Sequence, residues 1–146
     1  MESSVLSQQA DRLIELTAKL LGGENERMLI SLSQGEYGVL LVLSKNDAGV
    51  TSNSISQAMR IGPGGVANLL KALERKGYIT KDISRDDRRA NSVRITDAGR
   101  AALEGRLAQA RESARRYLAT IGPEAAVAFN DALETFLGVS TGNTKK

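Results

Sequence analysis

The segment from Gly62 to Ile95 constrains the fold more than any other, because a helical pattern in it is followed directly by two short alternating stretches. The spacing predicts a helix over Gly64–Lys76, with apolar residues at every third or fourth position along one side. That stripe consists of Val66, Leu69, Leu70 and Leu73. Gly77 follows at the position where a left-handed residue can end the helix. Tyr78–Ile83 and Asn91–Ile95 then predict the two strands of a hairpin.

The side of this helix opposite the stripe is polar, and the tip of the hairpin is charged. At roughly 100° per residue the polar side carries Gly64, Asn68, Lys71 and Arg75. The tip holds Arg85, Asp86, Asp87, Arg88 and Arg89. A polar-faced helix beside a basic hairpin is typical of a winged helix-turn-helix, in which one element enters the major groove and the other contacts the backbone or the minor groove. We therefore predict a mainly α (α+β) fold: a winged helix-turn-helix DNA-binding core with a two-stranded wing, flanked by N- and C-terminal dimerisation helices.

The net charge of +3 is distributed unevenly along the chain. The window from Lys71 to Arg94 contains eight basic and four acidic residues, so it carries +4 and the remainder of the chain carries −1. The positive charge thus coincides with the predicted helix and wing. A solvated charged face explains such a window as well as a nucleic-acid surface does, so charge alone leaves both interpretations open.

The composition excludes several classes of chemistry. The chain contains neither Cys nor His, which removes thiol redox chemistry, the usual zinc sites, and catalysis by Ser-His-Asp or Cys-His arrangements. The close carboxylate pairs, Asp86 with Asp87 and Glu24 with Glu26, lie in polar segments. We therefore expect no enzyme, no metal and no cofactor. Aromatic residues make up only 3% of the chain, which argues against a platform that stacks single-stranded bases.

No segment predicts export or a membrane span. The N-terminus lacks the basic start and apolar run of a signal peptide, and the longest apolar run, Val39–Leu43, is far too short to cross a bilayer. We expect a cytoplasmic protein with no membrane partner.

Helical patterns flank the central segment on both sides. Val5–Leu21 carries an apolar stripe (Leu6, Ala10, Leu13, Thr17 and Leu20). Ser33 and Glu36 have the spacing of a capping box that opens a helix to about Lys45. The inward side of that helix is predicted to carry Tyr37, Leu40, Leu41 and Ser44. Thr51 or Ser52 is expected to cap a short helix that ends near Met59.

Two further helices are predicted after the hairpin. Thr96 caps the first, and Gly122-Pro123 separates it from the second, with Pro123 at the first helical position. The last helix carries the apolar stripe Ala126, Phe129, Leu133 and Phe136. Turn-forming residues from Gly138 onward predict a disordered tail.

This pattern divides the chain into four segments. They are residues 1–32 (N-terminal helix and connector, dimerisation), 33–95 (winged helix-turn-helix), 96–137 (long and C-terminal helices, dimerisation) and 138–146 (tail). The apolar stripes of the terminal helices can pack on the domain itself or on a second copy of the chain. We favour a homodimer, because DNA-binding proteins of this size commonly read two half-sites.

The central residues resemble a known family. Residues 62–79 read GPGGVANLLKALERKGYI, which is similar to the recognition-helix segment of the MarR (multiple antibiotic resistance regulator) family. DRRA at 87–90 and VRITDAG at 93–99 look like that family's wing and the strand-to-helix junction after it. The resemblance covers about Leu32 to Gly105 in detail, and the flanking helices fit by pattern only.

The resemblance implies a homodimeric transcriptional regulator, often a repressor relieved by a small molecule, that binds pseudo-palindromic double-stranded DNA. In the family an aspartate of the wing holds an arginine in the minor groove, and the matching positions are Asp87 and Arg89. An ion pair confined to the hairpin tip is the alternative explanation of these residues. The wing arginines Arg85, Arg88 and Arg89 also favour DNA over the main alternative function, a winged-helix module that binds only protein.

The sequence departs from the family at the start of the recognition helix. Gly64 and Gly65 stand where the family often has Ser or Thr, so only their backbone N–H groups can hold a phosphate. Base reading would then fall on Asn68 and Lys71, with Arg75 on phosphate. A flexible helix entry is the alternative explanation of these glycines.

The resemblance also implies a site for a small-molecule effector between the dimer helices and the DNA-binding lobe. Tyr37, Arg27 and Arg60 can line such a space, but packing or solvated charge explains each of them better. The absence of Cys argues against direct peroxide sensing.

Overall fold

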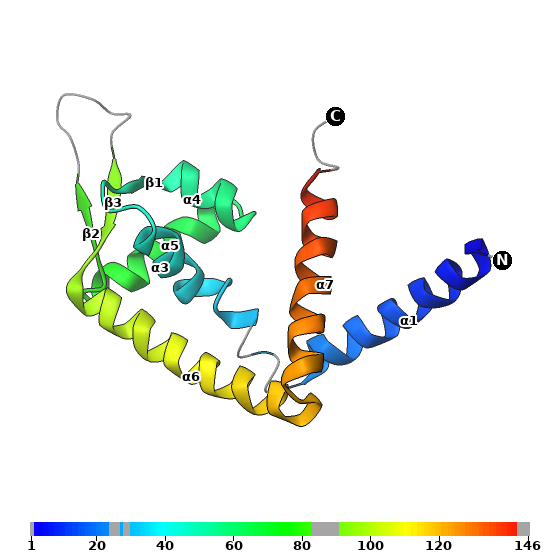
Figure 1. Ribbon diagram of the computed structural model, residues 1–146. Helices are drawn as coiled ribbons and strands as arrows, with labels where there is room; N and C mark the ends of the chain where they lie inside the picture. The colour runs from blue at the N-terminus through cyan, green and yellow to red at the C-terminus, as the bar shows by residue number, and fades with distance from the viewer. Residues whose placement is uncertain (1, 24–26, 28–29, 83–90, 143–146) are drawn as a thin grey trace. The chain divides into compact units, whose positions relative to one another are not determined.

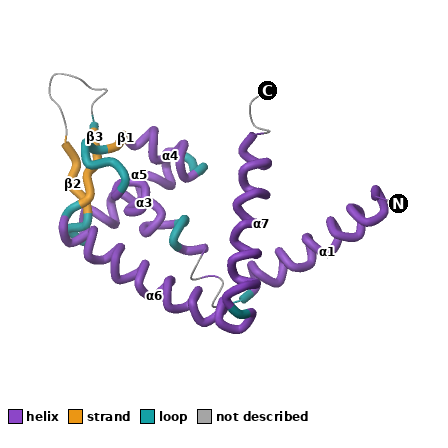
Figure 2. Tube along the Cα trace, viewed as in Figure 1, coloured by secondary structure: helices purple, strands orange, loops and turns teal. Residues whose placement is uncertain are grey.

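The computed structural model describes residues 2–23, 27, 30–82 and 91–142. Figure 1 shows the arrangement of the elements and Figure 2 their secondary structure. In chain order they are α1 (Glu2–Gly22), α3 (Gly35–Ser44), β1 (Val50–Thr51), α4 (Ser52–Met59), α5 (Pro63–Arg75), β2 (Ile79–Asp82), β3 (Ser92–Ile95), α6 (Asp97–Ile121) and α7 (Pro123–Gly142). The predicted mainly helical fold with a small antiparallel sheet is confirmed. In the described part of the chain, no helix combines the length and the hydropathy needed to cross a membrane.

The chain forms two compact units, residues 1–108 and 109–146, which divide within α6. The prediction ended the DNA-binding segment at residue 95, before this helix. The difference has a physical cause: Leu103 of α6 is buried in the winged-helix core, and Leu107 packs against that core. The first part of α6 therefore belongs to the unit that contains the helix-turn-helix.

In the first unit, α3, α4 and α5 pack on one another, and α3 and α5 also contact the sheet. Three members of the predicted α5 stripe are buried and the fourth, Leu69, is partly buried against the core. The core is aliphatic and consists of Val39, Leu40, Leu43, Ile55, Val66, Leu70, Leu73, Ile79, Val93 and Leu103. This packing orients α5, because its apolar side is inside and its opposite side must face solvent.

The sheet has three strands in the order β1-β3-β2, all antiparallel. β2 and β3 form the predicted hairpin, with Ile79 opposite Ile95. The third strand was not predicted: β1 is only two residues long, and it adds to the hairpin by pairing Val50 with Val93. β1 directly precedes α4, so this pairing ties the start of the helix-turn-helix to the wing.

Two of the predicted helix starts are confirmed. Thr51 precedes α4, and its hydroxyl oxygen accepts a hydrogen bond of 3.1 Å from the backbone N–H of Ser54. Thr96 precedes α6, and its hydroxyl accepts one of 3.1 Å from the N–H of Gly99. Each side chain thereby satisfies a donor that the first turn of a helix leaves without a partner.

The predicted capping box is wrong. Gln34 and not Ser33 precedes α3, and no side chain caps that helix. Ser33 instead ends the preceding turn, where its backbone N–H and its hydroxyl both donate to the carbonyl oxygen of Ile30. Glu36 accepts a hydrogen bond from Lys76, at 2.5 Å, so its carboxylate does not reach back to Ser33.

The second unit consists of the end of α6 and the whole of α7. Gly122, with φ of 83°, separates the two helices, and Pro123 begins α7 as predicted. α7 continues to Gly142, so the disordered tail predicted from Gly138 is wrong over residues 138–142. The helical period of α7 persists through its Gly, Ser and Thr residues, whose weak propensity does not stop a helix that is already formed.

Candidate nucleic-acid interface

Both ends of α5 are fixed by the local sequence. Gly62 precedes the helix in an extended conformation, and Pro63 occupies the first helical position, where its missing N–H costs nothing. At the other end Gly77 has φ of 74°, and the N–H of Tyr78 donates to the carbonyl oxygen of Leu73 at 3.0 Å. This arrangement closes the helix in the way that the predicted left-handed glycine implied.

The outward face of α5 is open. The predicted residues Gly64, Gly65, Asn68, Lys71 and Arg75 are all exposed. In the described part of the chain, the side chains of Asn68, Lys71 and Arg75 have no hydrogen-bond or ion-pair partner. The acidic residue of this helix, Glu74, forms an ion pair of 2.9 Å with Lys81 of β2. Two free cations and an amide thus face solvent on a helix that the core holds rigidly.

The fold does not require the glycines at the start of α5. A Cβ built at Gly62 or Gly64 has no atom within 4 Å, and one at Gly65 meets only Ile61, at 3.7 Å. Gly64 and Gly65 also lack the positive φ that favours glycine. A glycine inside a helix costs about 0.5–1 kcal/mol relative to alanine, so these residues weaken the helix without a steric reason. These glycines leave the backbone at the start of α5 without side chains, so the first N–H groups of that helix are accessible.

The base of the wing is described, and its tip is not. Arg85, Asp87, Arg88 and Arg89 lie outside the described residues. In the hairpin stem, Arg94 pairs with Asp82 at 3.3 Å. Lys76, Lys81 and Arg94 are therefore each paired with a carboxylate, whereas Lys71 and Arg75 are not. Within the basic window, the described free charge is on the outward face of α5.

One threonine joins α5 to α6. The Thr96 hydroxyl donates to the carbonyl oxygen of Gly77 at 2.6 Å while it accepts from Gly99. The N–H of Thr96 donates to the carbonyl oxygen of Tyr78 at 3.0 Å. Any Cβ at Gly99 would collide with that same carbonyl oxygen, so the close approach of the first turn of α6 to the Tyr78 backbone requires glycine there.

The three residues considered for an effector site have different surroundings. Tyr37 is partly buried against the core, and the guanidinium carbon of Arg106 lies 5.3 Å from the centre of its ring. Arg106 also donates to the Ser31 hydroxyl at 2.7 Å. Arg27 is exposed, and Arg60 is exposed in the turn between α4 and α5. The sequence pattern gave no signal for the Arg106 contacts, because they join residues far apart in the chain.

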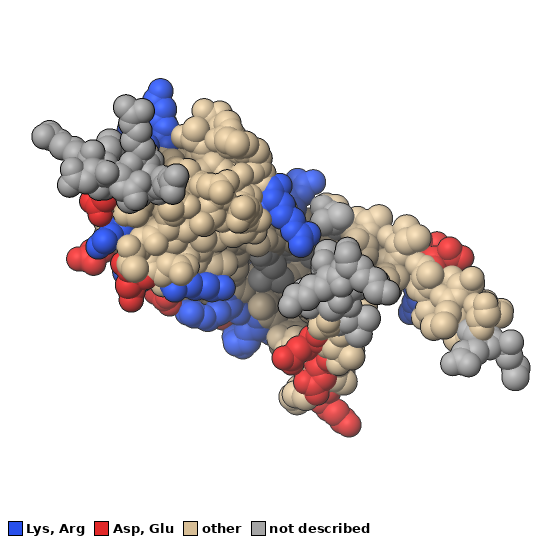
Figure 3. Space-filling model, turned by 90° about the horizontal axis from the view of Figure 1, so that it is seen from above, with Lys and Arg blue, Asp and Glu red and all other residues tan. Residues whose placement is uncertain are grey.

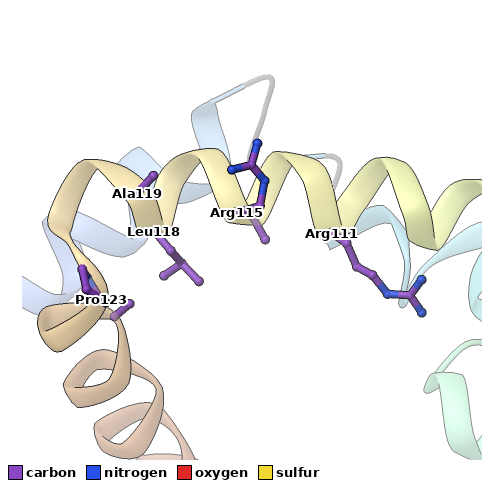
Figure 4. Close-up of a pocket in the computed structure, with 7 residues that line it drawn as sticks. Arg111, Arg115, Leu118, Ala119 and Pro123 are labelled. Atoms are coloured by element: carbon purple, nitrogen blue, oxygen red, sulfur yellow. The ribbon is translucent and has the colours of Figure 1, made fainter.

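An open apolar hollow of about 460 Å³ lies in the second unit where α6 meets α7 (Figure 4). It is lined by Arg111, Ala114, Arg115, Leu118, Ala119, Pro123 and Ala126. The hydrogen bonds that Arg115 donates to Glu112 lower the pKa of that carboxyl below its usual value. None of the residues considered for an effector lines this hollow.

Comparison with known proteins agrees with this geometry. Residues 30–90 match a model of the MarR family. The chain is 27% identical over 131 residues to YfiV of Bacillus subtilis, an uncharacterised helix-turn-helix-type transcriptional regulator, covering 90% of this chain and 81% of that protein.

Solved structures share the fold. A MarR family protein from Bacillus stearothermophilus superposes with a TM-score of 0.73 at 17% identity, covering 97% of this chain and 99% of that one. Streptococcus pneumoniae FabT, solved in complex with DNA, gives 0.70 at 19% identity, covering 92% and 99%. YfiV and YdgJ of Bacillus subtilis are both named helix-turn-helix-type transcriptional regulators, which agrees with the expectation of a regulator rather than an enzyme. The chain thus resembles the MarR family over residues 30–90, and its winged helix-turn-helix fold is that of solved MarR family proteins.

Proposed function

We propose that this chain binds double-stranded DNA as a homodimer, recognises a pseudo-palindromic operator and represses transcription from it. The observation that carries this proposal is the outward face of α5, where Asn68, Lys71 and Arg75 are exposed and have no partner in the described part of the chain. A cation that folding leaves unpaired is available to a phosphate or a base edge. The DNA complex of the structurally similar FabT supports the same use of this fold.

The residues of α5 divide by chemistry. Asn68 and Lys71 lie toward the middle of the outward face and suit base edges, since amide and ammonium groups read distinct donor and acceptor patterns in the major groove. Arg75 is in the last turn and suits a phosphate. The backbone N–H groups at Gly64 and Gly65 can hold a phosphate, because the first turn of a helix leaves its donors free.

The wing contributes a second contact in this proposal. Arg89, oriented by Asp87, enters a minor groove, where a narrow A·T-rich segment concentrates negative potential. Arg85 and Arg88 then contact the backbone on either side. The described stem of the wing supports this role, because β2 follows α5, β3 precedes α6, and the two strands pair in one antiparallel hairpin.

The homodimer is supported by the apolar faces of the terminal helices. Leu6, Leu13 and Leu20 of α1 and Phe129 and Phe136 of α7 are all at least half exposed. Exposed apolar stripes of this kind mark interaction sites. In the proposed dimer these faces cover one another and set the spacing of the two α5 helices, which must be about 10 base pairs to read one face of DNA. Relief of repression by a small molecule is part of the proposal only because the resemblance to the MarR family implies it.

The test is a binding-site selection followed by a salt titration. Wild type should select a palindromic motif from random duplex DNA, and log affinity should fall linearly with log salt. Arg89→Ala should weaken binding most on sites with A·T-rich flanks. Asn68→Ala should relax one base pair in each half-site at a cost of about 1–3 kcal/mol, whereas Arg75→Ala should weaken all sequences alike.

Two results would contradict the proposal. If wild type selects no motif and its binding does not depend on salt, the chain uses its winged helix for protein contact. If Asn68→Ala and wild type select the same motif, Asn68 does not read a base. Transcription in vitro from a promoter that carries the selected site then distinguishes a repressor from an activator.

A further inference from the structure

Arg60 has an unusual backbone conformation at the turn of the helix-turn-helix. It ends α4 with φ of 54° and ψ of 41°, in the left-handed region. In the described part of the chain, every other residue with positive φ is a glycine. A left-handed residue commonly ends a helix, but glycine and asparagine are the residues that adopt this conformation readily. An arginine here is a departure from what local structure favours.

The turn itself does not need an arginine side chain. The backbone N–H groups of Arg60 and Ile61 both donate to the carbonyl oxygen of Ser56. The Ser56 hydroxyl donates in return to the carbonyl oxygen of Ile61 at 2.6 Å. Ile61 then packs against the core, and Gly62 precedes α5. These contacts fix the path of the chain through backbone atoms and Ser56, so a glycine at residue 60 would satisfy the fold better.

The Arg60 charge is also not neutralised. Its side chain is exposed and has no hydrogen-bond or ion-pair partner in the described part of the chain. No Asp or Glu occurs between Ala48 and Leu73, a stretch that covers β1, α4, the turn and most of α5. Figure 3 shows the winged-helix unit from above, with a broad area free of charged side chains and with both basic and acidic side chains along its edges. Arg60 and Lys71 are the basic residues of that stretch.

We propose that Arg60 binds a DNA phosphate beside the groove that receives α5 and thereby positions the helix-turn-helix on the duplex. The inference rests on the proposed DNA-binding function and adds a positioning residue to it. In a helix-turn-helix the second helix lies in the major groove and the first helix crosses the backbone, so the turn between them lies beside that backbone. A guanidinium suits this role because it can donate two parallel hydrogen bonds to one phosphate. Gly62 and Gly64 have no atom within 4 Å of a built Cβ, so the backbone of the duplex can approach the turn closely.

Three variants of the full chain test this inference. Arg60→Asn removes the charge but keeps a residue that accepts left-handed φ, and Arg60→Lys keeps the charge without the planar donors. Arg12→Asn is the matched control, because Arg12 is equally exposed and unpaired in the described structure but lies on α1. Each variant is titrated with the duplex selected by wild type and with a random duplex, over a range of salt concentrations.

The expected result is specific to a phosphate contact. Arg60→Asn should weaken binding to both duplexes by about tenfold, the effect of one charge-assisted hydrogen bond. The slope of log affinity against log salt should fall by about 0.9 for each bound chain. Arg60→Lys should keep the slope and lose part of the affinity, and Arg12→Asn should match wild type. The urea midpoint of Arg60→Asn should equal or exceed that of wild type, since the strained arginine is gone.

Three outcomes would overturn the inference. Wild-type affinity and slope for Arg60→Asn would show that Arg60 touches no phosphate. A loss on the selected duplex alone would make Arg60 a base reader. A lower urea midpoint for Arg60→Asn than for wild type would mean that the arginine serves the fold. If wild type itself binds neither duplex, the proposed function fails, and the positioning role fails with it.

Discussion

The winged-helix core and the terminal helices contrast in what happens to their apolar residues. Leu43, Ile55 and Leu73 of the core are completely buried, whereas Leu6 of α1 and Phe129 of α7 are 64% and 56% exposed. The helices α4 and α5 of the core carry amphipathic patterns, and so do α1 and α7, so the difference does not lie in the pattern. It lies in whether the same chain supplies a covering surface. One chain alone buries the apolar residues of the core. The terminal helices leave apolar residues exposed, and a partner could cover them.

The largest effect on assembly and DNA binding is expected from the exposed phenylalanines of α7. Phe129→Ala/Phe136→Ala should shift the protein from dimer to monomer and abolish tight operator binding, because each buried phenylalanine is worth about 1.5–3 kcal/mol and both chains lose two. The winged helix should still fold. Light scattering at micromolar concentration measures the assembly, with Asn130→Ala/Glu134→Ala on the same helix as the control. A wild-type monomer of 15.6 kDa that bound a palindromic operator tightly would contradict the dimer.

The core should respond differently from the terminal helices. Leu73→Ala should lower the free energy of unfolding by about 2–5 kcal/mol, since it opens a cavity among fully buried side chains. Leu133→Ala, made in the Phe129→Ala/Phe136→Ala background, should change that free energy by no more than about 0.5 kcal/mol, as exposed positions do. Urea unfolding measures both. Equal losses for the two variants would mean that α7 is packed within one chain.

Two glycines of the winged-helix unit are expected to respond in opposite ways to substitution by alanine. Gly64→Ala should raise the free energy of unfolding by about 0.5–1 kcal/mol, because nothing meets the added Cβ and helix propensity improves. DNA binding should weaken at the same time if the duplex approaches this backbone. Gly99→Ala is the control with the opposite sign, since its Cβ meets the Tyr78 carbonyl. A less stable Gly64→Ala would show that the helix entry needs glycine.

The smallest effect concerns the ion pair between α3 and the end of α5. The hydrogen bond to Glu36 raises the pKa of Lys76 above its ordinary value of 10.5. A raised folded-state pKa contributes stability below the ordinary value, and this contribution is lost as pH rises through the raised pKa. The stability difference between wild type and Glu36→Gln should therefore be small and should vanish in strongly alkaline solution. A difference that stays constant across that range would argue against the pair as its source.

Most of the winged helix could be predicted because its signals are local. The α5 stripe, the left-handed Gly77 and the caps at Thr51 and Thr96 depend on neighbours within one or two turns of the chain. The inward side of α3 was harder: the prediction named Tyr37, Leu40, Leu41 and Ser44, whereas Gly38, Val39, Leu40 and Leu43 are the buried residues. That helix is apolar on almost every side, so periodicity cannot choose its inner face.

The features that the sequence did not reveal depend on long-range contacts. β1 has two residues, too few for alternation, and it exists because β3 pairs with it. Leu103 extends the core because α6 brings it into the cluster of buried residues that includes Ile79 and Val93 of the sheet. No local sequence pattern predicts this contact. For the candidate interface, the exposed face of α5 followed from the helical period. The left-handed Arg60 did not, because its conformation depends on hydrogen bonds to Ser56.

Thr96 closes the end of α5 and begins α6 with one hydroxyl group. A side chain shared by two helix ends also couples their fluctuations. If the end of α5 frays, the hydroxyl loses the Gly77 carbonyl and is free to rotate away from the Gly99 amide. The amides at the two sites therefore belong to a single opening unit in hydrogen exchange. A serine at residue 96 could keep this coupling. A valine there, with nearly the same shape as threonine but no hydroxyl, would let the amide hydrogens of the two helices exchange with solvent independently.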